Sequence, residues 1–170
     1  GSLLNIISNQ HDSFTSKLET EIHLIGLANR KKMLINENGI SIKSWKSSLN
    51  KSRTKSDVKK FINNMIELNL PNSILVDSTA GAGVVKEYSK ILKKGISIAT
   101  PNKVANSDKY LDYSQIRDAA IQGNSFFKYE TNVGAALPVV AAISDLVNNG
   151  DEIIRIEGVL SGTLSYIFNA

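Results

Sequence analysis

Apolar and polar positions along the 170-residue chain follow two different periods, and each change of period marks a predicted element. Apolar residues three and four apart over residues 3–15 predict an amphipathic helix. The apolar run over residues 21–28 predicts a buried strand. Asn36–Gly39 separates two short apolar runs and is typical of a hairpin turn. Two helices are predicted next, one over residues 44–50 and one capped by Ser56 and running to about residue 69.

From residue 73 onward, strand-like and helix-like segments alternate regularly. The pattern predicts strands at 73–77, 96–99, 126–129 and 152–159. It predicts helices at 83–94, from Ser107 as a cap to 122, at 138–150, and from 162 onward, with Gly95, Gly123 and Gly150 as stop signals. Such alternation predicts an α/β fold, a Rossmann-like, doubly wound and mostly parallel sheet.

The start of the chain departs from the usual dinucleotide-binding pattern, which opens with a strand and a G-x-G-x-x-G turn. Here Gly1-Ser2 lead directly into a helix, and Gly81-Ala-Gly83 lacks the third glycine at the right spacing. We therefore expect the sheet to lack its first strand.

Composition narrows the class of protein. Hydrophobic residues make up 42% of the chain without a long apolar run, which excludes a transmembrane helix. No basic signal-peptide region is visible, so we expect a cytoplasmic protein without a membrane partner. The chain has no cysteine, which excludes disulfides and a thiol nucleophile. The net charge is +4, but Trp45 is the only aromatic residue in the basic stretch 43–60, so no nucleic-acid partner is expected.

Three predicted strands run into polar segments with Gly, Pro, Asn or Ser, at residues 99–107, 129–138 and 157–169. In an open α/β sheet, ligands bind at the carboxyl ends of the strands. These segments therefore predict one composite site.

Several residues at the strand ends have a functional and a structural interpretation. Lys103 can place positive charge on a carbonyl oxygen or orient a carboxylate, or it is a surface lysine. Ser78 and Thr79 can contact a cofactor ribose or phosphate, or they cap a helix. Asn29 and Arg30 follow the predicted strand 21–28. In dinucleotide sites the end of the second strand contacts the adenosine ribose, and basic residues without an acidic residue at that position favour NADP over NAD; the alternative is a basic loop.

Two acidic residues also have two interpretations. Glu130, beside a turn with free carbonyls, suits a hard cation such as Na⁺, K⁺ or Ca²⁺, or it caps a helix. Glu157, ahead of Ser161-Gly162-Thr163, binds substrate or pairs with a cation.

Three segments, Thr100–Asn106, Tyr129–Pro138 and Gly158–Phe168, together resemble homoserine dehydrogenase in order and spacing. Asn38–Trp45 is similar to the version found in bifunctional aspartate kinase–homoserine dehydrogenases. The resemblance implies reduction of aspartate 4-semialdehyde to homoserine with NADPH or NADH, on the route to threonine and methionine. It also implies a homo-oligomer, with an NAD(P)-binding domain at residues 1–137 and the start of an α+β substrate and dimerisation domain at 138–170.

The same resemblance implies roles for individual residues. Lys103 would act near the nicotinamide and substrate and supply positive charge to the developing alkoxide. The cofactor would be lined by Ser78, Thr79, Asn102 and Lys103. Glu130, with the carbonyls of Val133, Ala135 and Leu137, would hold a monovalent cation such as Na⁺ or K⁺. Gly162 and Thr163, together with Glu157, would contact the substrate.

Two other functions compete with this interpretation. An acylating semialdehyde dehydrogenase needs a cysteine nucleophile, which the chain lacks. A non-catalytic nucleotide-binding or regulatory module would bind the cofactor without turnover. Because the glycine loop and further family residues are missing, we expect the chain alone to be a fragment with little or no activity.

Overall fold

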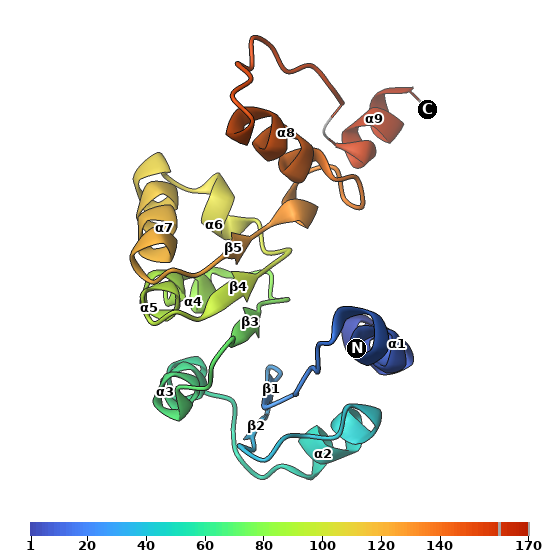
Figure 1. The fold of residues 1–170 in the computed structure, drawn as a ribbon, viewed down its shortest axis with the longest axis vertical. Coiled ribbons are helices and arrows are strands. Elements are labelled where there is room, and N and C mark those ends of the chain that lie inside the picture. The colour runs from blue at the N-terminus through green and yellow to red at the C-terminus, as the bar shows by residue number, and fades with distance from the viewer. Residues whose placement is uncertain (160, 170) are drawn as a thin grey trace. The chain divides into compact units, whose positions relative to one another are not determined.

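The computed structural model describes residues 1–159 and 161–169, which divide into two compact units, residues 1–70 and 71–170 (Figure 1). Each unit has its own secondary structure and buried side chains. The predicted domain boundary between residues 137 and 138 stays a prediction.

The first unit combines helices with a two-stranded antiparallel ribbon. Its core side chains are Met33, Ile40, Leu49 and Ile62, all less than 10% exposed. The elements are α1 (Ser2–Leu18), β1 (Gly26–Ala28), β2 (Met33–Ile35), the 3-10 helix η1 (Ile42–Ser44), α2 (Trp45–Lys51) and α3 (Val58–Leu68). The predicted helices at 3–15, 44–50 and 56–69 are confirmed, although Asp57 rather than Ser56 caps α3, by accepting from the Lys60 N–H.

The predicted strand at 21–28 is wrong in extent and burial. Only Gly26–Ala28 pairs, antiparallel to β2, and no residue of the run is buried. The Leu24 and Ile25 carbonyls instead accept from the N–H groups of Ile40 and Asn36. The hairpin turn lies at residues 29–32, between β1 and β2, and Asn36–Gly39 forms a separate turn that leads into η1.

The second unit contains a three-stranded parallel sheet in the order β3-β4-β5. Its strands are β3 (Ile74–Val76), β4 (Ser97–Ala99) and β5 (Phe127–Lys128). In register, Val76 pairs with Ala99, which pairs with Lys128, so all three strands end at one edge. The predicted parallel sheet is therefore confirmed for these strands.

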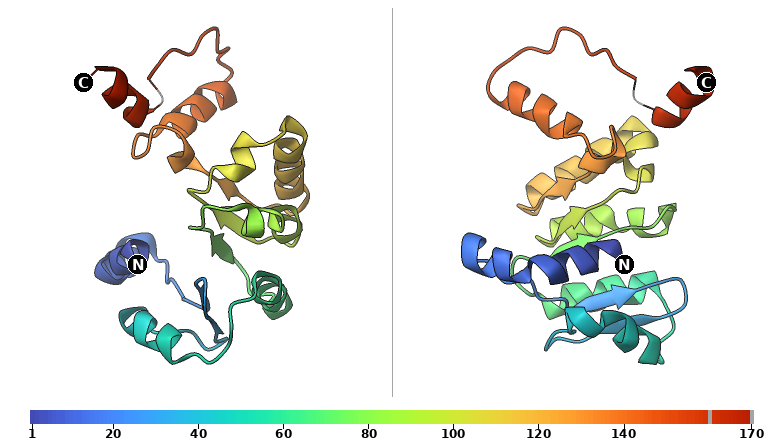
Figure 2. Two further views of the ribbon diagram at one scale, coloured as in Figure 1. Left: turned by 180° about the vertical axis from the view of Figure 1, so that it is seen from behind. Right: turned by 90° about the vertical axis from the view of Figure 1, so that its right-hand side faces the viewer.

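Helices α5 (Tyr88–Lys93) and α7 (Tyr110–Gln122) lie side by side against this sheet (Figure 2). Each strand-to-strand connection passes through helices, as parallel strands require. Leu75, Ile98 and Phe127 form one row across the sheet, and Ile98 is fully buried. Ile74 and Val76, which alternate with Leu75, are 64% and 46% exposed, so the two faces of β3 differ in burial.

Both predicted crossover helices are interrupted. The 83–94 segment consists of α4 (Ala82–Val85) and α5, and the segment starting at Ser107 consists of α6 (Val104–Ser107) and α7. Ser107 is thus the last residue of α6 and not the cap of α7, which follows Lys109. The glycine stop signals are confirmed: Gly95 has φ +75°, and Gly123 caps the C-terminus of α7.

After β5 the described chain is helical or irregular. It contains the 3-10 helix η2 (Glu130–Asn132), α8 (Val139–Asn148) and α9 (Gly162–Asn169). The predicted strand at 152–159 is wrong: its residues have no regular structure, and Ile154 is 94% exposed. Alternating apolar residues form a strand only where a neighbouring strand pairs with them, and no described strand does so here.

Candidate functional site

A buried polar cluster lies at the carboxyl ends of β3 and β4. Asp77 follows β3 directly, and Thr100 and Asn102 follow β4. These side chains are 3–4% exposed, and they meet the fully buried Tyr88 from α5. Burial of polar groups is costly unless they are hydrogen-bonded, so the pairing of each group is informative.

The Asp77 carboxylate is the centre of this cluster. Its Oδ1 accepts from the Thr79 N–H at 2.8 Å, and its Oδ2 accepts from the Tyr88 hydroxyl at 2.6 Å. The Asn102 side-chain amide donates to the same Oδ2 at 3.2 Å. Burial, followed by the hydrogen bond to Asp77, raises the pKa of Tyr88 well above its usual range. The Tyr88 hydroxyl therefore keeps its proton and serves as a donor.

Hydrogen bonds from Thr100 and Asn102 join the loop after β4 to the loop after β3. The Thr100 hydroxyl donates to the Asp77 carbonyl oxygen at 2.9 Å and accepts from the Asn102 N–H at 2.9 Å. The Asn102 amide also reaches the Gly81 carbonyl oxygen at 3.0 Å and Thr79 Oγ1 at 3.3 Å. We call residues 77–81 and 100–103 the paired loops, because side chains of each satisfy groups of the other.

The paired loops bring together four of the predicted site residues. Asn102 lies in the buried cluster, whereas Ser78, Thr79 and Lys103 lie beside it and are exposed. The capping interpretation of Ser78 and Thr79 is wrong, since Gly81 is the N-cap of α4 and no side chain caps that helix. Lys103 immediately precedes α6, next to the anchored Asn102.

Asn29 and Arg30 lie in the first unit, in the turn between β1 and β2. The Asn29 side-chain oxygen accepts from the N–H groups of Lys31 and Lys32, both at 2.8 Å. The Asn29 N–H also donates to the Lys32 carbonyl oxygen at 2.9 Å. Asn29 thus shapes the turn, and the exposed Arg30 lies at its tip.

Glu130 lies where β5 gives way to α8. Its two carboxylate oxygens accept from the Val140 and Ala141 N–H groups at 2.9 and 2.8 Å, so the carboxylate caps α8 as one interpretation predicts. Ala135 has φ +51° in the intervening turn, and the Leu137 carbonyl oxygen accepts from the Val139 N–H at 2.9 Å. Among the described residues, no group of three or more His, Cys, Asp or Glu side chains is placed to hold a metal ion.

The predicted substrate residues lie in the last part of the chain. Glu157 is exposed and pairs with Arg155, as its structural alternative predicts. Gly162 and Thr163 are exposed in the first turn of α9. Leu160, within the Gly158–Phe168 segment, and Ala170 lie outside the described residues.

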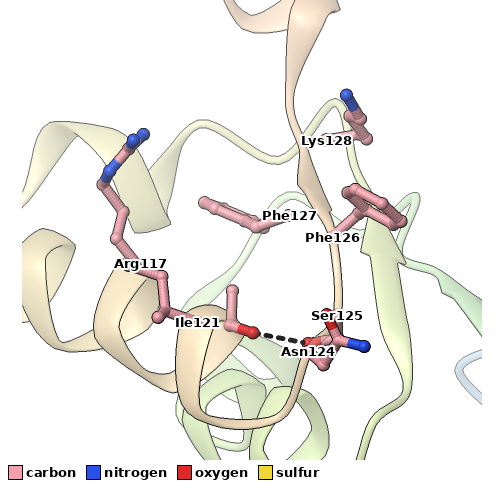
Figure 3. A pocket seen from close by; sticks show the side chains of 8 residues that line it. Arg117, Ile121, Asn124, Ser125, Phe126, Phe127 and Lys128 are labelled. Atoms are coloured by element: carbon pink, nitrogen blue, oxygen red, sulfur yellow. Dashed lines mark hydrogen bonds between the residues drawn. The ribbon is translucent and has the colours of Figure 1, made fainter.

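An open hollow of about 370 Å³ borders β5 and the end of α7 (Figure 3). Its polar lining includes Arg117, which donates to the hydroxyls of Tyr113 and Tyr129 at 3.1 and 3.3 Å. None of the sequence-predicted site residues lines it. The hollow is therefore separate from the site predicted at the strand ends.

Sequence reasoning missed Asp77 and Tyr88 as parts of the site, whereas Thr100 lies within the predicted segment 99–107. Asp77 carried a usable signal, since a carboxylate directly after an apolar strand lies at the ligand-binding edge of a parallel sheet. Tyr88 carried no such signal, because only the packing of α5 brings its hydroxyl to Asp77.

In the described part of the chain, no helix is both long and apolar enough to cross a bilayer.

Comparison with known proteins finds family models that match most of the chain. Residues 1–130 match the family model for the homoserine dehydrogenase NAD-binding domain, and residues 138–170 match that for homoserine dehydrogenase. The chain is 38% identical, over 99% of its length, to a chloroplastic bifunctional aspartokinase/homoserine dehydrogenase 2 of Zea mays. It spans 18% of that relative.

Solved structures show the same fold. A Candida auris protein described as being of unknown function has a TM-score of 0.80 and 28% identity over 96% of this chain and 47% of its own. A hyperthermophilic archaeal homoserine dehydrogenase mutant, in complex with NADPH, has a TM-score of 0.63 and 19% identity over 86% of this chain and 45% of its own. From the family matches over most of its length, the chain belongs to the homoserine dehydrogenase family.

Proposed function

We propose that this chain forms the nucleotide-binding part of a homoserine dehydrogenase that reduces aspartate 4-semialdehyde to homoserine with NADPH. The observation that carries the proposal is the buried junction of the paired loops at the carboxyl ends of β3 and β4. A parallel α/β sheet binds nucleotides at this edge. The family match and the NADPH bound to an archaeal relative support the nucleotide as ligand.

The residues of the paired loops fit a nicotinamide nucleotide. Ser78 and Thr79 offer exposed hydroxyls for ribose or phosphate oxygens, and Asn102 holds the second loop against the first. In the first unit, Arg30 at the tip of its turn suits a 2′-phosphate, and we propose NADP as the preferred cofactor. When bound, the nicotinamide supplies the hydride.

Lys103 is proposed as the catalytic residue. Lys103 is exposed and follows the anchored Asn102 in the chain, so the loop fixes the backbone from which the lysine side chain starts. A positive charge placed at the substrate carbonyl oxygen stabilises the alkoxide that forms there, and this contribution is often the largest in such a site. Lys103 would bind that oxygen and favour delivery of a proton to it.

We further propose a monovalent cation at Glu130. Each carboxylate oxygen accepts one backbone N–H and keeps lone pairs for a second partner. The carbonyls of Val133, Ala135 and Leu137 lie in the turn between Glu130 and α8, and hard cations prefer such oxygens. The cation would brace this turn and need not take part in hydride transfer.

Glu157, Gly162 and Thr163 are proposed to contact the substrate. Gly162 and Thr163 are exposed residues in the first turn of α9, where N–H groups lack partners within the helix and a carboxylate is favoured. The exposed Glu157 would bind the substrate ammonium group in place of Arg155. Self-association into a homo-oligomer is part of the same proposal, as it is implied by the family.

NADPH oxidation in the presence of aspartate 4-semialdehyde tests the catalytic proposal. The rate is measured for this chain and for a polypeptide of the relatives' full length that contains the chain. The test variant is Lys103→Ala, and Lys109→Ala, at another exposed lysine, is the matched control. Loss of one charge-stabilising group lowers turnover by about 100-fold or more, and we expect this for Lys103→Ala alone. NADPH binding without turnover in either polypeptide would contradict the enzyme and favour a non-catalytic nucleotide-binding module.

A further inference from the structure

Asp77 and Tyr88 have no part in the chemistry proposed above, yet they form the buried centre of the cluster. We propose that they are positioning residues, which hold the paired loops in the shape that accepts the nicotinamide half of NADP(H). This inference rests on the proposed function, because it names the residues that give the same site its shape.

The first argument is the way in which a single carboxylate connects both loops. Asp77 Oδ1 holds the backbone of its own loop through the Thr79 N–H, at 2.8 Å. Asp77 Oδ2 holds the other loop through the Asn102 amide, at 3.2 Å. A shift of this carboxylate would therefore move Thr79 and Asn102 together, and both are proposed cofactor contacts.

The second argument is that Tyr88, from α5, holds the Asp77 carboxylate in place. Its ring meets the Phe127 ring edge-on, with centroids 5.7 Å apart, so the side chain is held by β5 as well as by α5. Its hydroxyl is 2.6 Å from Asp77 Oδ2 and 3.1 Å from Thr100 Oγ1. The hydroxyl has one proton, and the shorter contact to the carboxylate identifies the acceptor.

The third argument is that the cluster reaches towards the proposed reacting residue. Asn102 Oδ1 accepts from the Val104 N–H at 3.1 Å, and the Asn102 carbonyl oxygen accepts from the Asn132 amide at 3.3 Å. Lys103 lies between these two anchored groups. Removal of the Tyr88 hydroxyl would loosen Asp77, then Asn102, and finally the backbone that carries Lys103.

Tyr88→Phe is the most selective change, because it keeps the ring that meets Phe127 and removes only the hydroxyl. Asp77→Asn is a second variant, which removes the carboxylate charge and replaces one of its two acceptor oxygens with an amide donor. Tyr113→Phe is the matched control, since it removes a hydroxyl that is bonded to Arg117 and Tyr129, outside the cluster. Circular dichroism would check that each variant is folded.

The affinities for two probes, NADPH and 2′,5′-ADP, are compared by titration of the chain. 2′,5′-ADP carries the adenosine end and the 2′-phosphate but lacks the nicotinamide half. We expect Tyr88→Phe and Asp77→Asn to weaken NADPH binding about tenfold, as expected for loss of one hydrogen bond to a charged group. Affinity for 2′,5′-ADP should change less than about twofold, and Tyr113→Phe should alter neither.

The outcomes separate this inference from the proposed function. Equal losses of affinity for both probes would show a general structural effect and overturn the positioning role. An NADPH affinity that stays unchanged in both variants would also overturn it. A wild-type chain that binds neither probe would overturn the proposed function, and this inference with it.

Discussion

At the residue scale, Tyr88 and Asp77 form the most completely buried polar contact described at the strand ends. A buried acceptor that loses its donor costs about 1–3 kcal/mol. We therefore expect Tyr88→Phe to lower the free energy of unfolding at neutral pH by about 1–3 kcal/mol, measured by urea denaturation.

The same contact predicts a dependence on alkaline pH. Burial and Asp77 raise the pKa of Tyr88 in the folded chain above the ordinary value of 10.0. Above pH 10 the unfolded chain loses this proton while the folded chain retains it, so the stabilising contribution of Tyr88 decreases as pH rises. The stability difference between wild type and Tyr88→Phe should then shrink above pH 10. Tyr110→Phe is the control, because Tyr110 is 80% exposed. A difference that grows with pH would contradict this prediction.

Glu130 gives a second prediction at the residue scale. Its carboxylate caps the first turn of α8 through two N–H groups, and loss of such a cap costs about 1 kcal/mol. Glu130→Ala should therefore lower the free energy of unfolding by about this amount.

The proposed cation adds a further dependence, because an ion that binds only the folded chain stabilises it. Wild-type thermal unfolding should occur at a higher temperature in NaCl or KCl than in tetramethylammonium chloride, and Glu130→Ala should lose that difference. Glu152→Ala, at an exposed acid after α8, is the control. A wild type that is indifferent to the cation would leave Glu130 as a helix cap alone.

At the scale of elements, the backbones of α5 and α7 lie close together where Gly123 ends α7. A Cβ on Gly123 would lie 1.8 Å from the Leu92 carbonyl oxygen, which is backbone and cannot turn away. The Ser125 hydroxyl also donates to this oxygen at 2.9 Å. Gly123→Ala must therefore separate the two helices or distort the turn after α7.

We expect Gly123→Ala to lower the free energy of unfolding by about 3 kcal/mol, at the upper end of the cost of overpacking. Chemical denaturation monitored by circular dichroism would measure this loss. Gly83→Ala is the control, since nothing lies within 4 Å of a Cβ at that position. Equal stabilities for the two variants would show that the α5–α7 contact relaxes freely.

At the scale of the whole molecule, the proposed preference for NADP rests on Arg30, which lies in the turn of the first compact unit. An arginine at the ribose distinguishes NADP from NAD through the 2′-phosphate. Arg30→Ala should weaken NADPH binding about tenfold and leave NADH binding within about twofold, measured by fluorescence titration. Lys43→Ala, in the basic stretch 43–60, is the control. Equal losses for both nucleotides would contradict a 2′-phosphate contact.

The sequence by itself determined the parallel strands β3, β4 and β5 and the glycines that end α5 and α7. These features depend on short apolar runs and on backbone conformations that glycine favours, and both are local. The polar strand ends and the family resemblance likewise predicted Asn102 and Lys103 as site residues, and both lie in the loop after β4.

Only the tertiary structure decided the features that depend on partners distant in sequence. The run at 152–159 alternates like a strand but has no described neighbour to pair with, and the run at 21–28 pairs over three residues only. Tyr88 belongs to the site solely because packing brings its hydroxyl to Asp77, 11 residues away in sequence. A hydrogen bond across a core is set by where elements pack, and the local pattern of residues does not encode that position.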